Sequence, residues 1–429
     1  MKKKINIAIC GLGNIGSYLY KYLIKNKRQL TEKNRSIPNI LLVYAKNKKK
    51  KRNLSIPKKR WAKNFDEIIK NKHIDLIIEL IGGSEGAAKN LVFKALKNKK
   101  HVVTANKALI AKYGDQLANI AEKNKVNLEF EASVCGGVPI IRSLKEGLIA
   151  NKIHKIYGIF NGTSNYILSS MDKQNKNFKE VLEDAKKLGY AESNPRADLN
   201  GDDVSSKLKI LSTLCFNSFL NNNIHVEGIK NIDKDDILNA NKLGYKIKLL
   251  GYSELINNSI NQRVHPTFIK KSSYIASIDG VLNAVIVEGS PVGQSVIQGE
   301  GAGPAATTSA LISDISSILR GNIKFPFSIS NNQRKKFKFK NINERNFSAY
   351  LRFEVIDKPG VLSNITSFFS ANKVSVKRLI QNPNKNKGSS SIIIITHSAK
   401  DKSLNKILKS VDKKSYILKK SKLIRIDDN

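Results

Sequence analysis

A chain of 429 residues with 41% hydrophobic residues is long enough for two or three domains with packed cores. Its formal charge of +40 rests on 75 basic residues, of which only 13 are arginine, spread along the whole chain. Proteins that bind nucleic acids usually cluster arginine and interleave aromatic residues. We therefore attribute the charge to the base composition of the genome, and we expect no specific nucleic-acid partner. The alternative is nonspecific adhesion to polyanions at low salt.

The cysteines and the N-terminal segment indicate a protein of a reducing compartment. Cys10, Cys135 and Cys215 are too few and too far apart for a disulfide framework or a zinc site. The basic N-terminus runs into a glycine loop too early for the apolar core of a signal peptide. No apolar run has the length of a membrane span. We expect a cytoplasmic protein without a membrane partner.

Short apolar strands alternate with helices in the first third of the chain. Strands are expected at Ile5–Cys10, Asn39–Ala45, Asp75–Ile81, His101–Thr104 and Leu128–Ala132. Helices are expected at Ser17–Lys25, Ala87–Asn98 and Asp115–Asn124. Such alternation predicts an α/β domain with a parallel, doubly wound sheet over residues 1–134.

The pattern changes at about Cys135. Helices are expected at Val138–Ala150, Lys179–Leu188, Val204–Phe216 and Ala305–Leu319, and strands at Ile153–Phe160, Ile260–Pro266 and Val281–Glu288. The mixture predicts an α+β domain with an open sheet over residues 135–327, suited to substrate binding.

The last part of the chain begins with a polar, basic segment at residues 328–345, which we interpret as a linker. A compact βαββαβ-like unit follows over residues 346–429. Its expected elements are strands Ser348–Ile356, Val374–Gln381 and Ser389–His397 and helices Val361–Ala371 and Lys402–Ser410. This order predicts a small ferredoxin-like domain.

A glycine loop, Gly11-Leu12-Gly13-Asn14-Ile15-Gly16, lies between the first strand and the first helix. In that context the motif is typical of a Rossmann dinucleotide site. Gly11 permits the turn, Gly13 lets the backbone approach a pyrophosphate, and Gly16 allows close helix packing. The helix start would receive the phosphates. The alternative is a structural turn without a ligand.

The second strand suggests which dinucleotide binds. NAD sites place an acidic residue near its end, for the ribose 2′-hydroxyl, but no acidic residue occurs between Glu32 and Asp66. A basic cluster that includes Lys46, Lys48 and Arg52 follows instead. Because positive charge suits a 2′-phosphate, we predict that NADP is preferred over NAD. The alternative is that this loop is basic only because the whole chain is.

Asp203 and Lys207 are four residues apart on an expected helix, so their side chains share one face. Behind a nucleotide-binding domain, this pair suggests proton transfer on a small zwitterion, although a surface salt bridge has the same spacing. Cys135 offers a rival chemistry as a thiol nucleophile, but no histidine adjoins it as a base, so a small buried cysteine is the preferred interpretation.

Several motifs occur together in one order and resemble those of homoserine dehydrogenases. They are Ile77–Gly83, Thr104–Leu109, Glu131–Pro139, Asn161–Tyr166, Glu192 with Asp198–Lys207, and Gly299–Pro304. The turn Asp357–Gly360 before a helix resembles that of an ACT regulatory domain. The resemblance spans nearly the whole chain. It implies that the helix at about 305–320 completes the nucleotide domain and that residues 135–327 also serve dimerisation.

The resemblance implies the NAD(P)-dependent interconversion of L-homoserine and L-aspartate 4-semialdehyde, a step in threonine, methionine and isoleucine biosynthesis. Lys207 matches the acid/base and Lys107 the second lysine, and the two are expected to lower each other's pKa by repulsion. Asp203 and Asp198 would offset their charge and orient the lysines or the substrate. The remaining matches are substrate contacts at Glu192, Thr163 and Tyr190, and cofactor contacts at Thr104, Lys107 and Gly303.

Two further sites follow from the resemblance. Backbone carbonyls at Glu131, Val134, Gly136 and Val138 would hold a monovalent cation, expected to be sodium. The ACT unit would bind an effector, expected to be L-threonine, through Gly360, Val361, Leu362 and Asn364. Since ACT units usually bind ligands at contacts with another ACT unit, a homodimer or homotetramer is expected.

Three alternatives remain at the level of the sequence. The first is another Rossmann oxidoreductase acting on an amino acid or aldehyde. The second is a catalytically inactive amino-acid sensor, against which the set Asp203, Lys207 and Lys107 argues. The third is an ACT unit kept for dimerisation without a ligand.

Overall fold

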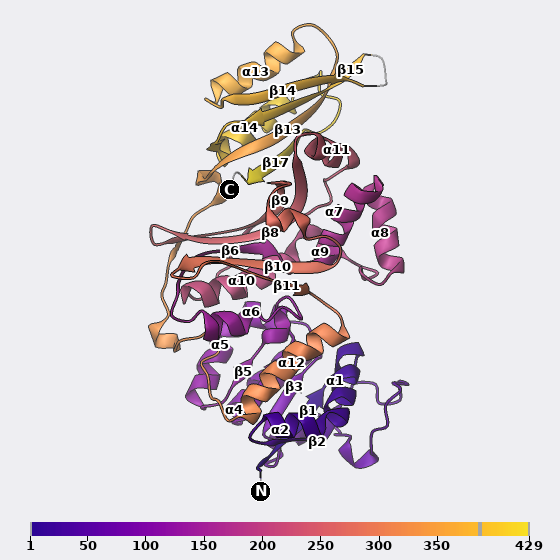
Figure 1. The fold of residues 1–429 in the computed structure, drawn as a ribbon, viewed down its shortest axis with the longest axis vertical. Coiled ribbons are helices and arrows are strands. Elements are labelled where there is room, and N and C mark those ends of the chain that lie inside the picture. Colours follow the sequence, from indigo (N-terminus) through magenta and orange to yellow (C-terminus); the bar gives the residue numbers. More distant parts are fainter. Residues whose placement is uncertain (1, 385–387, 428–429) are drawn as a thin grey trace.

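The N-terminal domain is built on a parallel five-stranded sheet with helices on both faces (Figure 1). The computed structural model describes residues 2–384 and 388–427. The strand order is β2-β1-β3-β4-β5, formed by β1 (Lys4–Cys10), β2 (Ile37–Tyr44), β3 (Leu76–Glu79), β4 (His101–Thr104) and β5 (Leu128–Glu129). The order reverses between β1 and β3, and ligands bind at such a switch point. The predicted doubly wound sheet is confirmed.

Two separate cores cover the faces of this sheet. On one face pack α1 (Asn14–Lys25) and α12 (Pro304–Leu319), and on the other α4 (Ala87–Lys97) and α5 (Lys107–Lys123). Shorter helices, α2 (Lys27–Lys33) and α3 (Phe65–Lys70), flank the sheet. The distant helix α12 thus returns to the nucleotide-binding domain, as Figure 1 shows by its orange colour beside indigo α1. Its buried residues include Leu311, Ile315 and Leu319.

The second domain carries an antiparallel sheet with the order β11-β10-β6-β8-β9. Its strands are β6 (Lys152–Ile159), β8 (Tyr245–Ile256), β9 (Ser259–Lys270), β10 (Leu282–Ser290) and β11 (Gly293–Glu300). The helices are α7 (Gly162–Gln174), α8 (Phe178–Lys187), α9 (Arg196–Asn200), α10 (Asp202–Phe216) and α11 (Lys234–Lys242). Helix α10 is buried along most of its length and packs against β6 and β8.

The same sheet continues into the C-terminal domain. Strand β17 (Lys422–Asp427) pairs in parallel with β9, and the order continues β17-β13-β15-β14. The remaining elements are β13 (Asn346–Ile356), α13 (Val361–Ala371), β14 (Val376–Pro383), β15 (Ser389–Thr396), β16 (Ala399–Lys400) and α14 (Asp401–Val411). They enclose a core of their own. The expected ferredoxin-like unit is therefore present and is joined to the second domain by backbone hydrogen bonds.

The segment at residues 328–345 is more ordered than its polar composition suggested. Strand β12 (Lys338–Phe339) pairs with β9, and Ile342 is buried. The buried Arg334 guanidinium donates to Asp115 Oδ1 at 2.6 Å and to the Ser218 carbonyl. Because these partners lie far away in the sequence, local composition did not reveal that the segment is packed.

Two expected helices differ in the structure, and strand β8 is among the elements that were not expected. The helix expected over Val138–Ala150 is one turn, α6 (Ile140–Arg142), followed by a π-turn at Ser143–Gly147. Helix α5 begins at Lys107 rather than at Asp115, because the Asn106 side chain caps it. Strand β8 was not predicted, since both of its faces are buried and it lacks alternating polarity.

Candidate active site

The glycine loop has the geometry expected of a dinucleotide site. Gly11 has φ +109°, and a Cβ there would lie 2.3 Å from the Leu80 carbonyl oxygen. A Cβ at Gly16 would lie 2.0 Å from the Gly11 oxygen, whereas one at Gly13 would meet nothing within 4 Å. Gly11 and Gly16 are therefore required for packing. Gly13 caps α1 and faces open space. A side chain at this position would therefore conflict only with a bound ligand.

Glu79, at the end of β3, organises the neighbouring loop and was not recognised from the sequence. Its buried carboxylate accepts hydrogen bonds from the backbone N–H groups of Ile81 and Gly82 and from the Thr104 hydroxyl. The Thr104 side chain is completely buried in this contact. The Thr104 hydroxyl therefore faces Glu79, and the expected contact of Thr104 with the cofactor stays a prediction. The sequence signal that could have identified Glu79 is a carboxylate at the end of an apolar strand.

The basic segment after β2 lies against the glycine loop. Arg52 donates from Nε to the Leu12 carbonyl at 2.9 Å and from its other nitrogens to the carbonyls of Lys50 and Asn47. Arg52 and Lys48 line an open cavity of about 360 Å³. Lys46 is exposed and does not line that cavity. The guanidinium of Arg52 therefore ties the basic segment to the turn that would carry the pyrophosphate.

A larger cavity of about 680 Å³ lies between the first two domains. The glycine loop contributes Ile15, and the loop before α12 contributes Gly303. All seven of the expected catalytic and substrate residues also line it: Lys107, Thr163, Tyr190, Glu192, Asp198, Asp203 and Lys207. The structure therefore brings these predicted residues together from segments up to 100 residues apart, and their roles stay predictions.

The carboxylate of Asp203 bridges the two lysines. Its Oδ1 lies 2.8 Å from Lys107 Nζ and its Oδ2 lies 2.9 Å from Lys207 Nζ. Lys207 also donates to the Phe160 carbonyl at 2.6 Å. Lys207 and Asp203 lie on successive turns of α10 and are buried, whereas the Lys107 side chain, at the start of α5, is 43% exposed. The arrangement is a buried ion pair with a second cation at the cavity wall.

Asn161 is the residue of this centre that we did not predict. Its amide nitrogen donates to Asp198 Oδ1 at 2.7 Å and to Asp203 Oδ2 at 2.9 Å. Its amide oxygen accepts from the Ser164 N–H and so caps α7. One buried asparagine thus fixes both carboxylates to a helix start. The sequence identified the motif Asn161–Tyr166 only by its resemblance to a family. The structure shows that Asn161 is the N-cap of α7, which explains an asparagine at this position.

The charges shift the pKa values of this centre. Burial alone would raise the pKa of Asp203, but the Lys207 and Lys107 ammoniums hold it well below its usual range. Burial disfavours the charged form of Lys207, yet Asp203 raises its pKa above the ordinary value. Our expectation that the lysines lower each other's pKa is wrong for Lys207, because a shared carboxylate lies between them. Burial raises the pKa of Asp198.

The expected substrate residues lie on one loop and the adjoining helix. The Thr163 hydroxyl, in the first turn of α7, donates to the Tyr190 carbonyl at 2.6 Å. The Tyr190 ring packs against Tyr166, with ring centroids 4.9 Å apart. Glu192 follows on the same loop and is exposed at the cavity. Thr163 therefore positions the loop, while the Glu192 carboxylate remains available to a ligand.

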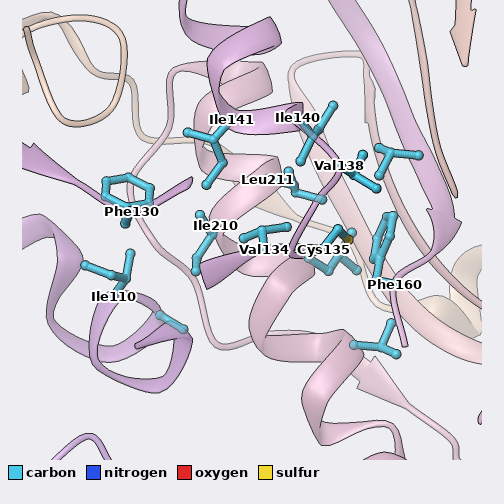
Figure 2. Close-up of a cluster of buried hydrophobic side chains, with 14 of the residues drawn as sticks. Ile110, Phe130, Val134, Cys135, Val138, Ile140, Ile141, Phe160, Ile210 and Leu211 are labelled. Atoms are coloured by element: carbon cyan, nitrogen blue, oxygen red, sulfur yellow. The ribbon is translucent and has the colours of Figure 1, made fainter. Parts of the chain in front are cut away.

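Cys135 lies among apolar side chains of the core, as Figure 2 shows. The residue is 1% exposed, and burial raises the pKa of its thiol. The side chains of Val134, Val138, Ile210 and Leu211 surround it in the same view. A thiolate nucleophile requires a lowered pKa, so the structure supports the buried, structural interpretation of this cysteine.

The expected cation segment forms a tight turn at the edge of the cavity. Cys135 and Gly136 both have positive φ, at 55° and 46°. Val134 and Val138 are buried. The Val138 carbonyl accepts from the Ile140 N–H at 2.8 Å, and the Glu131 carbonyl from the Val134 N–H at 3.3 Å. The side-chain carboxylate of Glu131 is occupied by the N–H groups of Ile141 and Arg142.

The loop of the C-terminal domain forms a separate cavity of about 350 Å³, lined in part by Gly360, Val361, Leu362 and Gln381. Gly360 has φ +87° and begins α13. Asn364 does not line this cavity, and its Oδ1 accepts from the Tyr416 hydroxyl at 2.7 Å. The structure thus brings three of the four expected effector residues together.

Fold and site together define a dinucleotide-dependent oxidoreductase with an appended ACT domain. The homoserine dehydrogenase model matches residues 139–316, its NAD-binding domain model residues 11–131, and the ACT domain model residues 349–414. None of the described helices is long and apolar enough to cross a membrane.

Curated and solved relatives agree over the full length. Homoserine dehydrogenase of Helicobacter pylori is 38% identical, with 100% of both chains covered, and that of Neisseria gonorrhoeae is 37% identical, with 99% of both covered. A solved homoserine dehydrogenase of Thiobacillus denitrificans has a TM-score of 0.92 at 35% identity over 99% of both chains. The chain belongs to the homoserine dehydrogenase family and has that function. An inactive sensor is not favoured.

Proposed function

We propose that Lys207 is the proton donor and acceptor in the interconversion of L-aspartate 4-semialdehyde and L-homoserine. The supporting observation is the Asp203 bridge, which keeps a buried ammonium at the cavity wall. A dinucleotide held by the glycine loop would supply the hydride to the aldehyde carbon in reduction and accept it from the same carbon in oxidation. In reduction the carbonyl π pair would move to the oxygen, which takes a proton from Lys207.

Lys107 and Glu192 would hold the two ends of the substrate. The Lys107 ammonium, at the carboxyl edge of the sheet, stabilises charge that develops on the substrate oxygen. Glu192 accepts hydrogen bonds from the substrate ammonium, and Asp198 with Asn161 keeps Asp203 in place. Tyr190 and Thr163 shape this end of the cavity.

Lys207→Ala tests the assignment by following NADPH absorbance with L-aspartate 4-semialdehyde. Loss of an acid/base group should lower kcat by about 10²–10⁴ with cofactor affinity little changed. Lys209→Ala is a matched control, since Lys209 lies on the same helix and contacts Asn222 instead of the cavity. Turnover of Lys207→Ala within a few-fold of the unmodified enzyme would transfer the role to Lys107 or water.

The basic segment supports a preference for NADP over NAD. Arg52 holds it beside the glycine loop, where positive charge would attract a 2′-phosphate. Replacing Lys46, Lys48 and Arg52 together by glutamine should raise KM for NADPH more than KM for NADH. Exchanging Lys58 and Lys59, on a separate turn, by glutamine is the control. Equal or better efficiency with NADH in the unmodified enzyme would refute the preference.

We propose that the turn at residues 131–138 holds a monovalent cation, expected to be sodium. The turn is tight, with positive φ at Cys135 and Gly136, and carbonyl oxygens suit a hard cation. The oxygens of Glu131, Val134, Gly136 and Val138 would hold it and so stabilise the junction of the two domains. Thermal unfolding in sodium against tetramethylammonium chloride, at equal ionic strength, should show a higher Tm in sodium.

The ACT cavity would receive L-threonine as a feedback effector. Gly360 and the start of α13 offer N–H groups to a carboxylate, and Asn364 could contact the ammonium only after leaving Tyr416. We also expect a homodimer or homotetramer that acts in the cytoplasm, where the three buried thiols remain reduced. Inhibition assays with threonine test the effector, and light scattering tests the oligomeric state.

A further inference from the structure

Lys248, on strand β8, is a buried lysine outside the proton-transfer centre. Its side chain is 2% exposed. Its ammonium donates to Asp279 Oδ1 at 2.8 Å, to the Ile278 carbonyl at 2.5 Å and to Asn165 Oδ1 at 3.1 Å. An ammonium has three donors, so all of them are used. Since a buried charge is costly unless it is paired and hydrogen-bonded, these contacts hold their partners to one point of β8.

Asn165 connects the same partners to helix α7. Its amide nitrogen donates to the carbonyls at both ends of the segment 278–282, at 3.1 Å to Ile278 and at 3.2 Å to Leu282. Its amide oxygen is the atom that receives Lys248. The lysine, the asparagine and the segment therefore form one hydrogen-bonded unit between β8 and α7.

This segment forms part of the wall of the catalytic cavity. Val281 lines the cavity, as do Gly162 and Thr163, the first two residues of α7. A Cβ at Gly162 would lie 2.5 Å from the Val281 carbonyl oxygen, so the backbone of the segment packs directly against the helix start. A displacement of residues 278–282 would therefore change the shape of the cavity at this end.

Lys248 lies on the face of β8 that points away from the helix carrying Lys207. Successive side chains of a strand point to opposite faces. Ser253 of β8 faces α10, where its hydroxyl lies 2.8 Å from that of Ser212. Lys248 is an odd number of residues away from Ser253, and the register of β8 with β9 is unbroken between them, so Lys248 occupies the other face. Loss of its ammonium should therefore leave α10 in place.

We propose that Lys248 is a positioning residue for the substrate end of the catalytic cavity. By joining residues 278–282 to Asn165, its ammonium holds the wall formed by Val281 against the start of α7. The first turn of this helix also positions the loop that carries Glu192, whose contact with the substrate ammonium is the proposed function on which this inference rests. Loss of Lys248 should therefore weaken substrate binding and leave the hydride and proton transfers nearly unchanged.

Lys248→Met tests the proposal in the full chain, because methionine keeps an unbranched side chain and removes all three donors. In homoserine oxidation, KM for L-homoserine should rise about ten-fold, while KM for NADP stays within about two-fold and kcat within about three-fold. Lys246→Met is the matched control. Lys246 lies on the same face of β8 and contacts the other carboxylate oxygen of Asp279 at 3.4 Å, so its loss removes a charge from the same cluster. The control should leave both KM values within about two-fold.

Three results would overturn the proposal. The first is an unchanged KM for L-homoserine in Lys248→Met. The second is an equal rise of both KM values, which a general loss of structure would cause. The third is the same rise in Lys246→Met, which would assign the effect to charge alone.

If Lys248→Met does not fold, Ser169→Ala decides. The Ser169 hydroxyl oxygen, on α7, accepts the Gly280 N–H of the same segment at 3.0 Å. Its loss should raise KM for L-homoserine about three-fold with KM for NADP unchanged, as expected for one hydrogen bond. An unchanged KM for L-homoserine would refute the role of the segment.

Glu192→Gln, measured in parallel, separates this inference from the proposed function. A raised KM for L-homoserine in Glu192→Gln with a normal one in Lys248→Met overturns the positioning role alone. A normal KM in Glu192→Gln refutes the proposed substrate contact and, with it, the basis of the inference.

Discussion

Exchanging Asp203 for asparagine tests the charge arrangement on which the active site depends. Asparagine keeps the size of the side chain but removes the charge that meets Lys107 at 2.8 Å and Lys207 at 2.9 Å. Removing one partner of a buried ion pair typically costs about 3–5 kcal/mol. Water can solvate the half-exposed Lys107, so the cost comes from the buried Lys207 alone. We therefore expect Asp203→Asn to lower the unfolding free energy by about 3 kcal/mol, the lower end of this range.

The pH dependence should change in a defined direction. Asp203 has a lowered pKa in the folded state, so its stabilisation is present above the unfolded pKa of about 3.9 and is lost as pH falls through the folded value. Lys207 has a raised pKa, so its contribution is present below about 10.4 and is lost as pH rises through the folded value. The variant should lose both contributions at neutral pH.

The rate of reduction should report the same change. Asp203→Asn removes the carboxylate that raises the pKa of Lys207. Burial then dominates and lowers that pKa. Since Lys207 must be protonated to donate, kcat for aldehyde reduction should begin to fall at a lower pH in Asp203→Asn than in the unmodified enzyme. The assays are NADPH absorbance across pH and unfolding by urea.

Asp202→Asn is the matched control, because Asp202 is exposed on the same turn of α10. It should leave both the pH profile and the unfolding free energy within about 0.5 kcal/mol of the unmodified enzyme. The reasoning is refuted if the unfolding free energy of Asp203→Asn also lies within about 0.5 kcal/mol of that of the unmodified enzyme and the variant keeps the unmodified pH profile. In that case the bridge seen between the two lysines would contribute nothing to stability or proton transfer.

Three further exchanges probe the glycine loop and the domain junction. Gly11→Ala should destabilise the fold, because its Cβ would lie 2.3 Å from a carbonyl oxygen, whereas Gly13→Ala should fold normally but bind NADPH more weakly. Thermal unfolding and cofactor titration distinguish them, and equal Tm losses would contradict this division. Burial raises the pKa of Glu131 to about 7, so the folded state holds more protons than the unfolded state between about pH 4.3 and 7. Stability should therefore fall as pH rises through that window, and Glu131→Gln should remove that part of the slope. An unchanged slope in urea unfolding across this range would show that Glu131 does not titrate there.

The sequence by itself determined the architecture and predicted most of the polar residues that line the candidate active site. Strand and helix periodicity together with the glycine loop are local signals, so they predicted the parallel sheet and its dinucleotide site. Lys107, Asp203 and Lys207 were predicted because they lie in motifs several residues long. The four-residue spacing of Asp203 and Lys207 also fixes them on one face of α10, whatever the rest of the chain does.

Only the tertiary structure decided how these groups act on one another. A pKa depends on charges brought together from distant segments, so the Asp203 bridge and the raised pKa of Lys207 could not follow from spacing within one helix. The same holds for Asn161, which joins two carboxylates through its cap, and for Glu79, which takes the Thr104 hydroxyl away from the cavity. The pairing of β17 with β9 likewise joins strands more than 150 residues apart in the chain, which no local pattern could predict.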